Sequence, residues 1–263
     1  MRHNKKIDNL CIFLVFLFLF LPIVVLVVFS FNTSKLNIVF EGFTLDWYKN
    51  LFHNKVLMES LKNTLIVAGI STVLSTILGT MSAYALHKFK FPFKKFINEL
   101  LYIPIVIPEI VLGISLLCIY TLLKFELGMF TLILSHICFS IPFVVISVRS
   151  VLEVMDPNLE KVASDLGASK LKTFFYITIP SLMPGILSGA QLAFTLSLDD
   201  VVISYFTAGP DSNTLPLQIY SIIKTGITPD VNALITILLL IILVTLTLST
   251  LYKIKALKNE VRV

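Results

Sequence analysis

Long apolar runs separated by short polar segments dominate the pattern of this 263-residue chain. A helix needs roughly 20 consecutive apolar residues to span a bilayer, and several runs reach that length. The pattern predicts six membrane-spanning helices, at about residues 10–31, 61–86, 100–123, 127–148, 181–206 and 233–252. We therefore expect an all-α membrane protein whose residues 1–263 form one helical bundle, because the chain leaves little sequence for a second domain.

Composition supports this class of protein. Hydrophobic residues make up 56% of the chain and charged residues 14%, with a mean hydropathy of +0.91, whereas soluble domains are typically about 25% charged. The first apolar run, from Leu10 to Phe31, carries no charge. A cleavable signal peptide would have a shorter apolar core of about 7–15 residues, so we expect this run to stay as a membrane anchor.

The basic residues are divided unequally between the two sides of the predicted bundle. One side would hold fifteen of the 21 Lys and Arg residues, namely Arg2, Lys5, Lys6, Lys88, Lys90, Lys94, Lys95, Arg149, Lys161, Lys170, Lys172, Lys253, Lys255, Lys258 and Arg262. Cytoplasmic loops carry the excess of Lys and Arg. We therefore expect both termini and the 149–180 loop to be cytoplasmic. Because the net charge of +5 is spread over separate loops, we expect no nucleic-acid binding.

The polar segment from Asp156 to Pro180 is predicted to form two short helices joined at Gly167. Asp156 can cap the first helix and Pro157 suits its first position. Gly167 can adopt the left-handed conformation that ends a helix, Ser169 can cap the second helix, and Pro180 would close it. One face of the first helix is expected to be apolar and to consist of Leu159, Val162, Ala163 and Leu166.

Charged residues are expected to face water around this apolar stripe, namely Glu160, Lys161, Asp165, Lys170 and Lys172. Two interpretations remain open from the periodicity alone. The segment is either an amphipathic elbow that lies among lipid headgroups, or a docking surface for a partner on one side of the membrane.

The spacing of the segment resembles the cytoplasmic loop of bacterial ABC importer permeases. The family pattern is Glu-Ala-Ala, three residues, Gly, nine residues, then Ile-x-Leu-Pro. This chain has Lys161-Val162-Ala163, then Gly167, then Ile177-Thr178-Ile179-Pro180. The glutamate of the pattern is missing; either Glu160 substitutes for it or the acidic contact is weaker here.

A longer resemblance, to the second permease of spermidine/putrescine importers, covers most of the chain. It is carried by residues 194–204, 214–221 and 228–233, including Leu198-Asp199-Asp200-Val201-Val202. The resemblance implies a six-helix type I (MetI-like) permease that pairs with a related permease, an ABC ATPase dimer and an external substrate-binding protein. It also implies polyamine cargo, and contact with the ATPase through Glu160, Lys161, Ala163, Asp165, Gly167, Ala168 and Pro180.

Three acidic residues lie inside predicted spans. Asp199 falls about 22 Å along a helix that begins near Pro184, in the outer third of the bilayer, with Asp200 beside it. Acids at such depths are costly in lipid and are typical of a cation pathway; the alternative is a helix-end cap or an ion pair with a partner. Glu109, about 14 Å into its span, is a second candidate, unless it only packs beside the Pro108 kink.

Other features carry less chemistry. Small residues recur along the second span and predict close helix packing, and His136 is expected to form an interhelical hydrogen bond rather than relay protons. The three cysteines have no metal-binding spacing, and we expect no metal or cofactor. The chain lacks G-x-x-x-x-G-K-[ST], so ATP hydrolysis must come from a partner.

Alternatives to a polyamine permease remain. The nearest is an ABC permease for another small solute, such as a sugar, iron or an anion. A stand-alone cation channel or secondary carrier would need no ATPase, but would more naturally have repeated halves with broken helices. A membrane-embedded enzyme is the least favoured, because no catalytic constellation is evident in the sequence.

Overall fold

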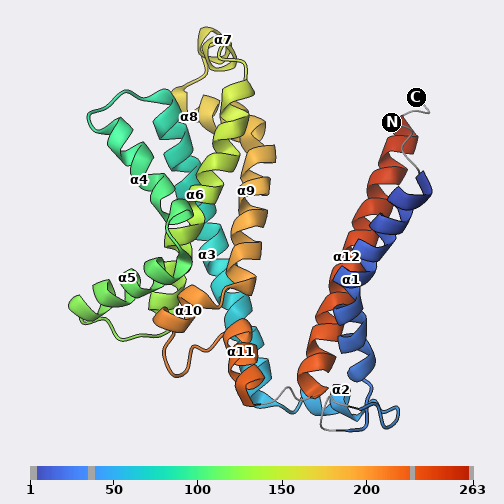
Figure 1. The fold of residues 1–263 in the computed structure, drawn as a ribbon. Helices are drawn as coiled ribbons and strands as arrows, with labels where there is room; N and C mark the ends of the chain where they lie inside the picture. Colours follow the sequence, from blue (N-terminus) through green and yellow to red (C-terminus); the bar gives the residue numbers. More distant parts are fainter. Residues whose placement is uncertain (1–4, 35–38, 226–228, 261–263) are drawn as a thin grey trace. The chain divides into compact units, whose positions relative to one another are not determined.

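The computed structural model describes residues 5–34, 39–225 and 229–260, with side chains described at 9–34, 39–224, 229–244 and 247. The described residues form helices and contain no strand; one isolated β-bridge pairs Asn32 with Phe43. The predicted all-α class is therefore confirmed. The chain divides into two compact units, Met1–Met58 with Ser221–Val263, and Glu59–Tyr220, and each is described by itself (Figure 1).

The first unit contains α1 (Lys5–Phe29), α2 (Asp46–Leu51) and α12 (Pro229–Glu260), with α12 packed against the other two. Asn54 donates a hydrogen bond to the Asp230 carboxylate over 2.8 Å, which ties the start of α12 to the segment after α2. The apolar part of α1 is almost entirely exposed within the chain, as a lipid-facing helix would be. The last predicted span, 233–252, continues beyond Val244 into a stretch in which only the side chain of Thr247 is described.

Three long helices form the core of the second unit: α3 (Lys55–Lys88, of which the part from Glu59 lies in this unit), α6 (Met129–Val154) and α9 (Ile179–Asp199). Small residues allow them to approach closely, as the sequence predicted. A Cβ atom at Gly79 would lie 2.7 Å from Val144 Cβ, and one at Gly185 would lie 2.7 Å from the Ser147 carbonyl oxygen. The buried core comprises Ala83, Val144, Val145, Val148, Leu152, Leu182 and Ala193.

The predicted span at 100–123 is not one helix. It consists of α4 (Lys94–Val106) and α5 (Glu109–Leu122), which are bent by 113° relative to each other. Pro108 causes the break, because a residue before proline avoids helical geometry, and Ile107 adopts an extended conformation with ψ of 135°. The sequence predicted a bent helix here, but the bend is large enough to separate two elements.

The predicted fifth span at 181–206 is also interrupted. Helix α9 ends at Asp199, and the short α10 (Val202–Thr207) follows after a break at residues 200–201; α11 (Leu215–Thr225) comes later. Four described helices are long and apolar enough to span a membrane, or five if the bent pair α4 and α5 counts as one span. The count of six spans therefore stays a prediction.

Candidate functional site

The 156–180 segment forms the predicted helix–Gly–helix elbow. Helix α7 (Leu159–Asp165) is followed by Gly167 in the left-handed conformation, with φ of +83°, and then by α8 (Lys170–Thr173). The Ser169 hydroxyl accepts a hydrogen bond from the Lys172 amide over 3.4 Å and so caps α8. The stop at Gly167 and the cap at Ser169 are both confirmed.

Both ends of the elbow differ from the prediction. Helix α7 begins at Leu159, so Asp156 is not its cap; its carboxylate instead accepts a hydrogen bond from the Asn158 amide over 2.9 Å in the preceding turn. Pro180 does not close the second helix. A π-helical turn (Phe174–Thr178) carries α8 directly into α9, and Pro180 lies in the first turn of α9, where its missing N–H is tolerated.

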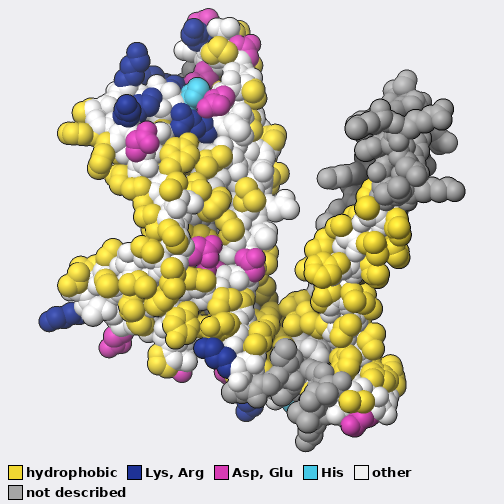
Figure 2. Space-filling view, viewed as in Figure 1, with side chains coloured by type: hydrophobic (Ala, Val, Ile, Leu, Met, Phe, Trp, Pro, Cys, Tyr) yellow, Lys and Arg dark blue, Asp and Glu magenta, His cyan; other side chains and the backbone are white. Residues whose placement is uncertain are grey.

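The apolar side of α7 is mostly uncovered by the rest of the chain. Ala163 is 4% exposed, but Val162 is 54% exposed and Leu166 is 83% exposed. Lys161 and Asp165 beside them are exposed as well. We call Lys161, Val162, Asp165 and Leu166 the coupling surface. Charged and apolar side chains are mixed at the end of the unit that carries α7 (Figure 2).

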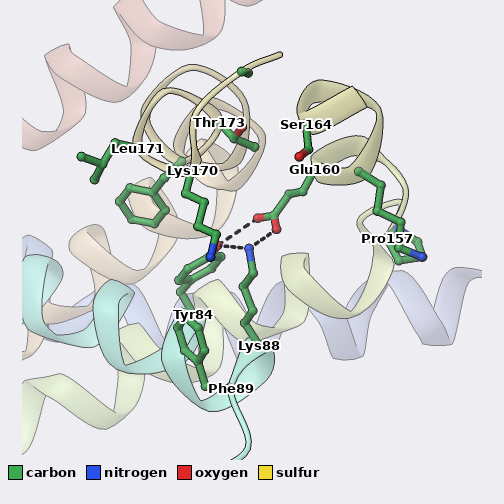
Figure 3. A pocket seen from close by; sticks show the side chains of 12 residues that line it. Tyr84, Lys88, Phe89, Pro157, Glu160, Ser164, Lys170, Leu171 and Thr173 are labelled. Atoms are coloured by element: carbon green, nitrogen blue, oxygen red, sulfur yellow. Dashed lines mark hydrogen bonds and ion pairs between the residues drawn. The ribbon is translucent and has the colours of Figure 1, made fainter. Parts of the chain in front are cut away.

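Glu160 is the exception to the predicted orientation of the charged residues, because it points inward rather than to water. Its carboxylate accepts hydrogen bonds from the Thr178 hydroxyl at 2.7 Å and the Tyr84 hydroxyl at 3.0 Å, and it forms an ion pair with Lys88. Tyr84 and Lys88 lie at the end of α3, and Thr178 is the last residue of the π-helical turn that precedes α9. Figure 3 shows Lys88, Tyr84 and Glu160 converging. We call Glu160, Lys88 and Tyr84 the Glu160 latch.

The Glu160 latch lines a pocket of about 570 Å³ between α3, α7 and α8, whose other walls include Phe89, Pro157, Ala168, Lys170 and Phe174. Partial burial raises the pKa of Glu160, but the hydrogen bonds from Lys88, Thr178 and Tyr84 outweigh it and lower the pKa overall. The carboxylate is therefore ionised at neutral pH and holds α7 against α3.

The two adjacent acids that the sequence places in one span have different environments. Asp200 is buried, and its carboxylate accepts hydrogen bonds from the Ile203 amide (3.1 Å), the Ser204 amide (2.7 Å) and the Ser204 hydroxyl (2.7 Å). It therefore caps α10, which is the helix-end alternative that the sequence left open. Asp199, the last residue of α9, is exposed.

His136 completes the buried cluster around Asp200. One ring nitrogen lies 2.6 Å from the Ser197 hydroxyl, and the other lies 3.1 Å from the Ser204 hydroxyl and 3.5 Å from the Asp200 carboxylate. The histidine thus links α6 to α9 and α10, and the predicted interhelical hydrogen bond is confirmed.

Glu109 is exposed at the first position of α5. Its predicted depth of about 14 Å assumed a straight helix from Leu100, and the break at Pro108 makes that estimate wrong. A pocket of about 310 Å³ lies close in sequence to both acids. Its lining begins one residue after Glu109 and two residues after Asp199, and consists of Ile110, Val201, Val202, Tyr205, Phe206 and Tyr220. Sequence reasoning missed Tyr205 and Phe206 of this lining, because α10 was not foreseen as a separate element.

The arrangement of long helices and an exposed elbow agrees with what is known of related chains. Residues 75–259 match the family described as the binding-protein-dependent transport system inner membrane component. The chain belongs to this family, the permease subunits of ABC importers, and is a multi-pass membrane protein.

Its curated relatives include permeases of polyamine systems. The chain is 42% identical over 230 residues to the spermidine/putrescine transport system permease protein PotC of Escherichia coli (strain K12), covering 88% of this chain and 87% of that protein. It is 38% identical to the putrescine transport system permease protein PotI of the same strain, covering 85% of this chain and 82% of that one. A PotC homolog of Mycoplasma genitalium is 35% identical, with 96% and 93% covered.

Solved structures of ABC transporters share the fold. A chain of a bacterial transporter involved in the import of the acidic polysaccharide alginate superposes with a TM-score of 0.74 at 16% identity, covering 94% of this chain and 95% of that one. A chain of the MetNI methionine transporter gives a TM-score of 0.59 at 17% identity, with 72% and 90% covered. At these identities the likeness describes architecture alone.

Proposed function

We propose that the chain is the permease subunit of an ATP-driven polyamine importer. The observation that carries this proposal is the 42% identity to PotC over 88% of the chain. In this proposal a second, related permease completes the pathway, an ABC ATPase dimer binds at the 149–180 loop, and a substrate-binding protein delivers cargo from outside. Both termini are cytoplasmic, in keeping with the distribution of Lys and Arg.

The coupling surface would contact the ATPase. Its apolar residues Val162 and Leu166 are 54% and 83% exposed, and exposed apolar patches with polar rims mark protein interaction sites. Lys161 and Asp165 would supply the charged rim, and Gly167 and Ala168 the turn. Glu160 is engaged inside the chain, so it would position α7 rather than replace the missing glutamate of the family pattern.

The substrate pathway would run past Asp199 and Glu109. Both carboxylates are exposed, and a polyamine supplies the opposite charge. The aromatic pocket beside them offers Tyr205 and Tyr220, and aromatic faces attract organic cations. Asp200, which is committed to capping α10, would shape this pathway by holding the break between α9 and α10.

Transport measurements test the proposal directly. The chain, expressed with its ATPase, second permease and binding protein in a bacterium lacking polyamine importers, should give ATP-dependent uptake of radiolabelled spermidine or putrescine. Uptake of a sugar, iron or an anion with no polyamine uptake would establish the alternative cargo. Failure of the chain to co-purify with any ATPase would contradict the coupling part of the proposal.

Neutralising Asp199 is expected to reduce transport without affecting folding. In Asp199→Asn the exposed carboxylate that attracts the cation is removed, while the buried cluster around Asp200 is untouched. We expect spermidine uptake at low substrate concentration to fall by about fivefold, consistent with loss of about 1 kcal/mol of electrostatic attraction. Asp211→Asn, an exposed acid elsewhere in the same unit, is the control. Unchanged uptake in Asp199→Asn would remove Asp199 from the pathway.

Removing the charge of Glu160 is expected to loosen α7. The Lys88 ammonium is partly solvated, with its side chain 42% exposed, so Glu160→Gln should weaken the latch by about 1 kcal/mol. Hydrogen exchange of the α7 amides should then become about fivefold faster, while exchange in Asp165→Asn should match the unaltered chain. Adding Lys88→Gln to Glu160→Gln should accelerate the exchange of the α7 amides little further. Purely additive effects would show that the two residues do not act together.

The lowered pKa of Glu160 fixes the sign of the pH dependence of this latch. The contribution of the latch to the stability of α7 is fully present above the ordinary glutamate pKa of about 4.3. It is lost only as the pH falls through the lower value in the folded protein. Exchange of the α7 amides, corrected for intrinsic rates, should therefore be insensitive to pH between 6 and 8.

A further inference from the structure

A second polar pocket lies apart from the coupling surface and from the acids of the pathway. It has a volume of about 470 Å³ and is formed where α3 ends, α4 begins and α6 ends; its lining is Leu86, His87, Lys94, Lys95, Asn98, Arg149 and Glu153. Three Lys and Arg side chains from two helices thus share this lining with one carboxylate. Figure 2 shows dark blue side chains gathered over this part of the second unit.

Arg149 is held in place at this pocket. One terminal nitrogen of its guanidinium donates to Asn98 Oδ1 at 2.7 Å and to the Tyr102 hydroxyl at 3.3 Å, and Nε lies 3.3 Å from Glu153. No described residue accepts a hydrogen bond from the other terminal nitrogen. A fixed guanidinium with unused donors is suited to bidentate recognition of a phosphate.

The two lysines add charge that the protein does not neutralise. Among the residues that the structure describes, the Lys94 ammonium donates only to the backbone carbonyl of Phe89, over 3.1 Å. Lys95 is exposed and has no hydrogen bond or ion pair within the described part of the chain. Glu153, the one carboxylate of the lining, is already paired with Arg149 and has a side chain 62% exposed. The pocket therefore carries a net positive charge and favours an anion.

The surroundings favour a lipid over a soluble anion. The pocket lies at the ends of the long apolar helices α3 and α6, where the headgroups of a bilayer spanned by these helices would lie. Large apolar side chains are exposed close by in sequence, with Phe93 at 78% and Phe96 at 62% exposure. Helix α4 has no buried residue, so its apolar side is available to acyl chains. Basic pockets between helices at this depth are typical of anionic lipid sites.

We infer that this pocket binds the phosphate headgroup of an anionic phospholipid in the cytoplasmic leaflet. The phosphate would lie between Arg149 and the two lysines, and the acyl chains would lie along α4. This inference rests on membrane embedding and on the side of the bilayer assigned above. It does not depend on polyamine cargo, so a change of cargo would leave it intact.

Lipid binding to the full-length chain in detergent, measured by native mass spectrometry, tests the inference. The probes are phosphatidylglycerol and phosphatidylcholine with identical acyl chains. Phosphatidylglycerol should bind more tightly to the unaltered chain. The double variant Lys94→Gln/Lys95→Gln should weaken phosphatidylglycerol binding by about 30-fold, because each cation near an anionic headgroup contributes to affinity. Lys95→Gln alone, which leaves the Lys94–Phe89 contact intact, should show a smaller loss of the same kind.

The matched control is Lys90→Gln/Lys172→Gln, which removes the same charge from the same end of the unit but outside the pocket lining. It should leave the preference for phosphatidylglycerol unchanged. Three results would overturn the inference: equal losses in the two double variants, equal binding of both lipids to the unaltered chain, or displacement of the lipid by glycerol phosphate at an equal concentration. The last result would identify a soluble anion as the ligand.

Discussion

Replacing Gly167 by valine is expected to lower ATP-dependent uptake by about tenfold or more while leaving membrane insertion normal. Gly167 has φ of +83°, where a β-branched residue is strained by about 1–3 kcal/mol. A Cβ atom at this position would meet no atom within 4 Å beyond its chain neighbours, so we expect the cost to come from the backbone conformation. The elbow would open toward other conformations, and motion of the ATPase would no longer reach α9 as a rigid displacement.

Two matched variants separate backbone strain from added bulk. Gly167→Asn should keep most activity, because asparagine tolerates the left-handed region. Gly128→Val should also be tolerated, since Gly128 has an extended φ of 176° and open space around its Cβ position. Uptake by Gly167→Val equal to that of the unaltered chain would disprove the role of the elbow as a lever.

The elements that the sequence predicted best are those set by local chemistry. Uncharged apolar runs predicted the long helices, because lipid requires backbone groups to be satisfied within each segment. The left-handed glycine and the Ser169 cap followed from preferences of single residues. The breaks at Pro108 and Asp200 were harder to predict. A proline predicts a bend but not its angle, and an acid within an apolar run does not reveal that it will cap a new helix.

The candidate site was only partly predictable, for the same reason. The amphipathic pattern of α7 placed Glu160 among the residues facing water. Its true orientation depends on Lys88 and Tyr84, which lie more than seventy residues earlier in the chain. Likewise, the different surroundings of Asp199 and Asp200 depend on His136, Ser197 and Ser204 from three helices. Such groupings arise from tertiary packing and leave little trace in sequence spacing.

Asp200→Ala is expected to destabilise the folded protein strongly, whereas Asp199→Ala is not. Alanine at 200 would leave the Ile203 and Ser204 amides and the Ser204 hydroxyl without their acceptor, and would remove the carboxylate that lies 3.5 Å from His136. Loss of a helix cap together with newly unsatisfied buried groups should cost about 2–4 kcal/mol. At 199 the side chain is exposed and its removal should change the free energy of unfolding by less than about 0.5 kcal/mol.

Thermal unfolding of the purified chain in detergent measures this difference, with Asp200→Asn as a third variant. Asparagine keeps one acceptor oxygen for the α10 amides but removes the charge next to His136, so its stability should lie between those of the alanine variant and the unaltered chain. Equal stability of Asp199→Ala and Asp200→Ala would mean that the break between α9 and α10 does not depend on the cap. A selective loss of stability in Asp200→Ala, with a selective loss of uptake in Asp199→Asn, would separate the positioning acid from the acid that attracts the substrate.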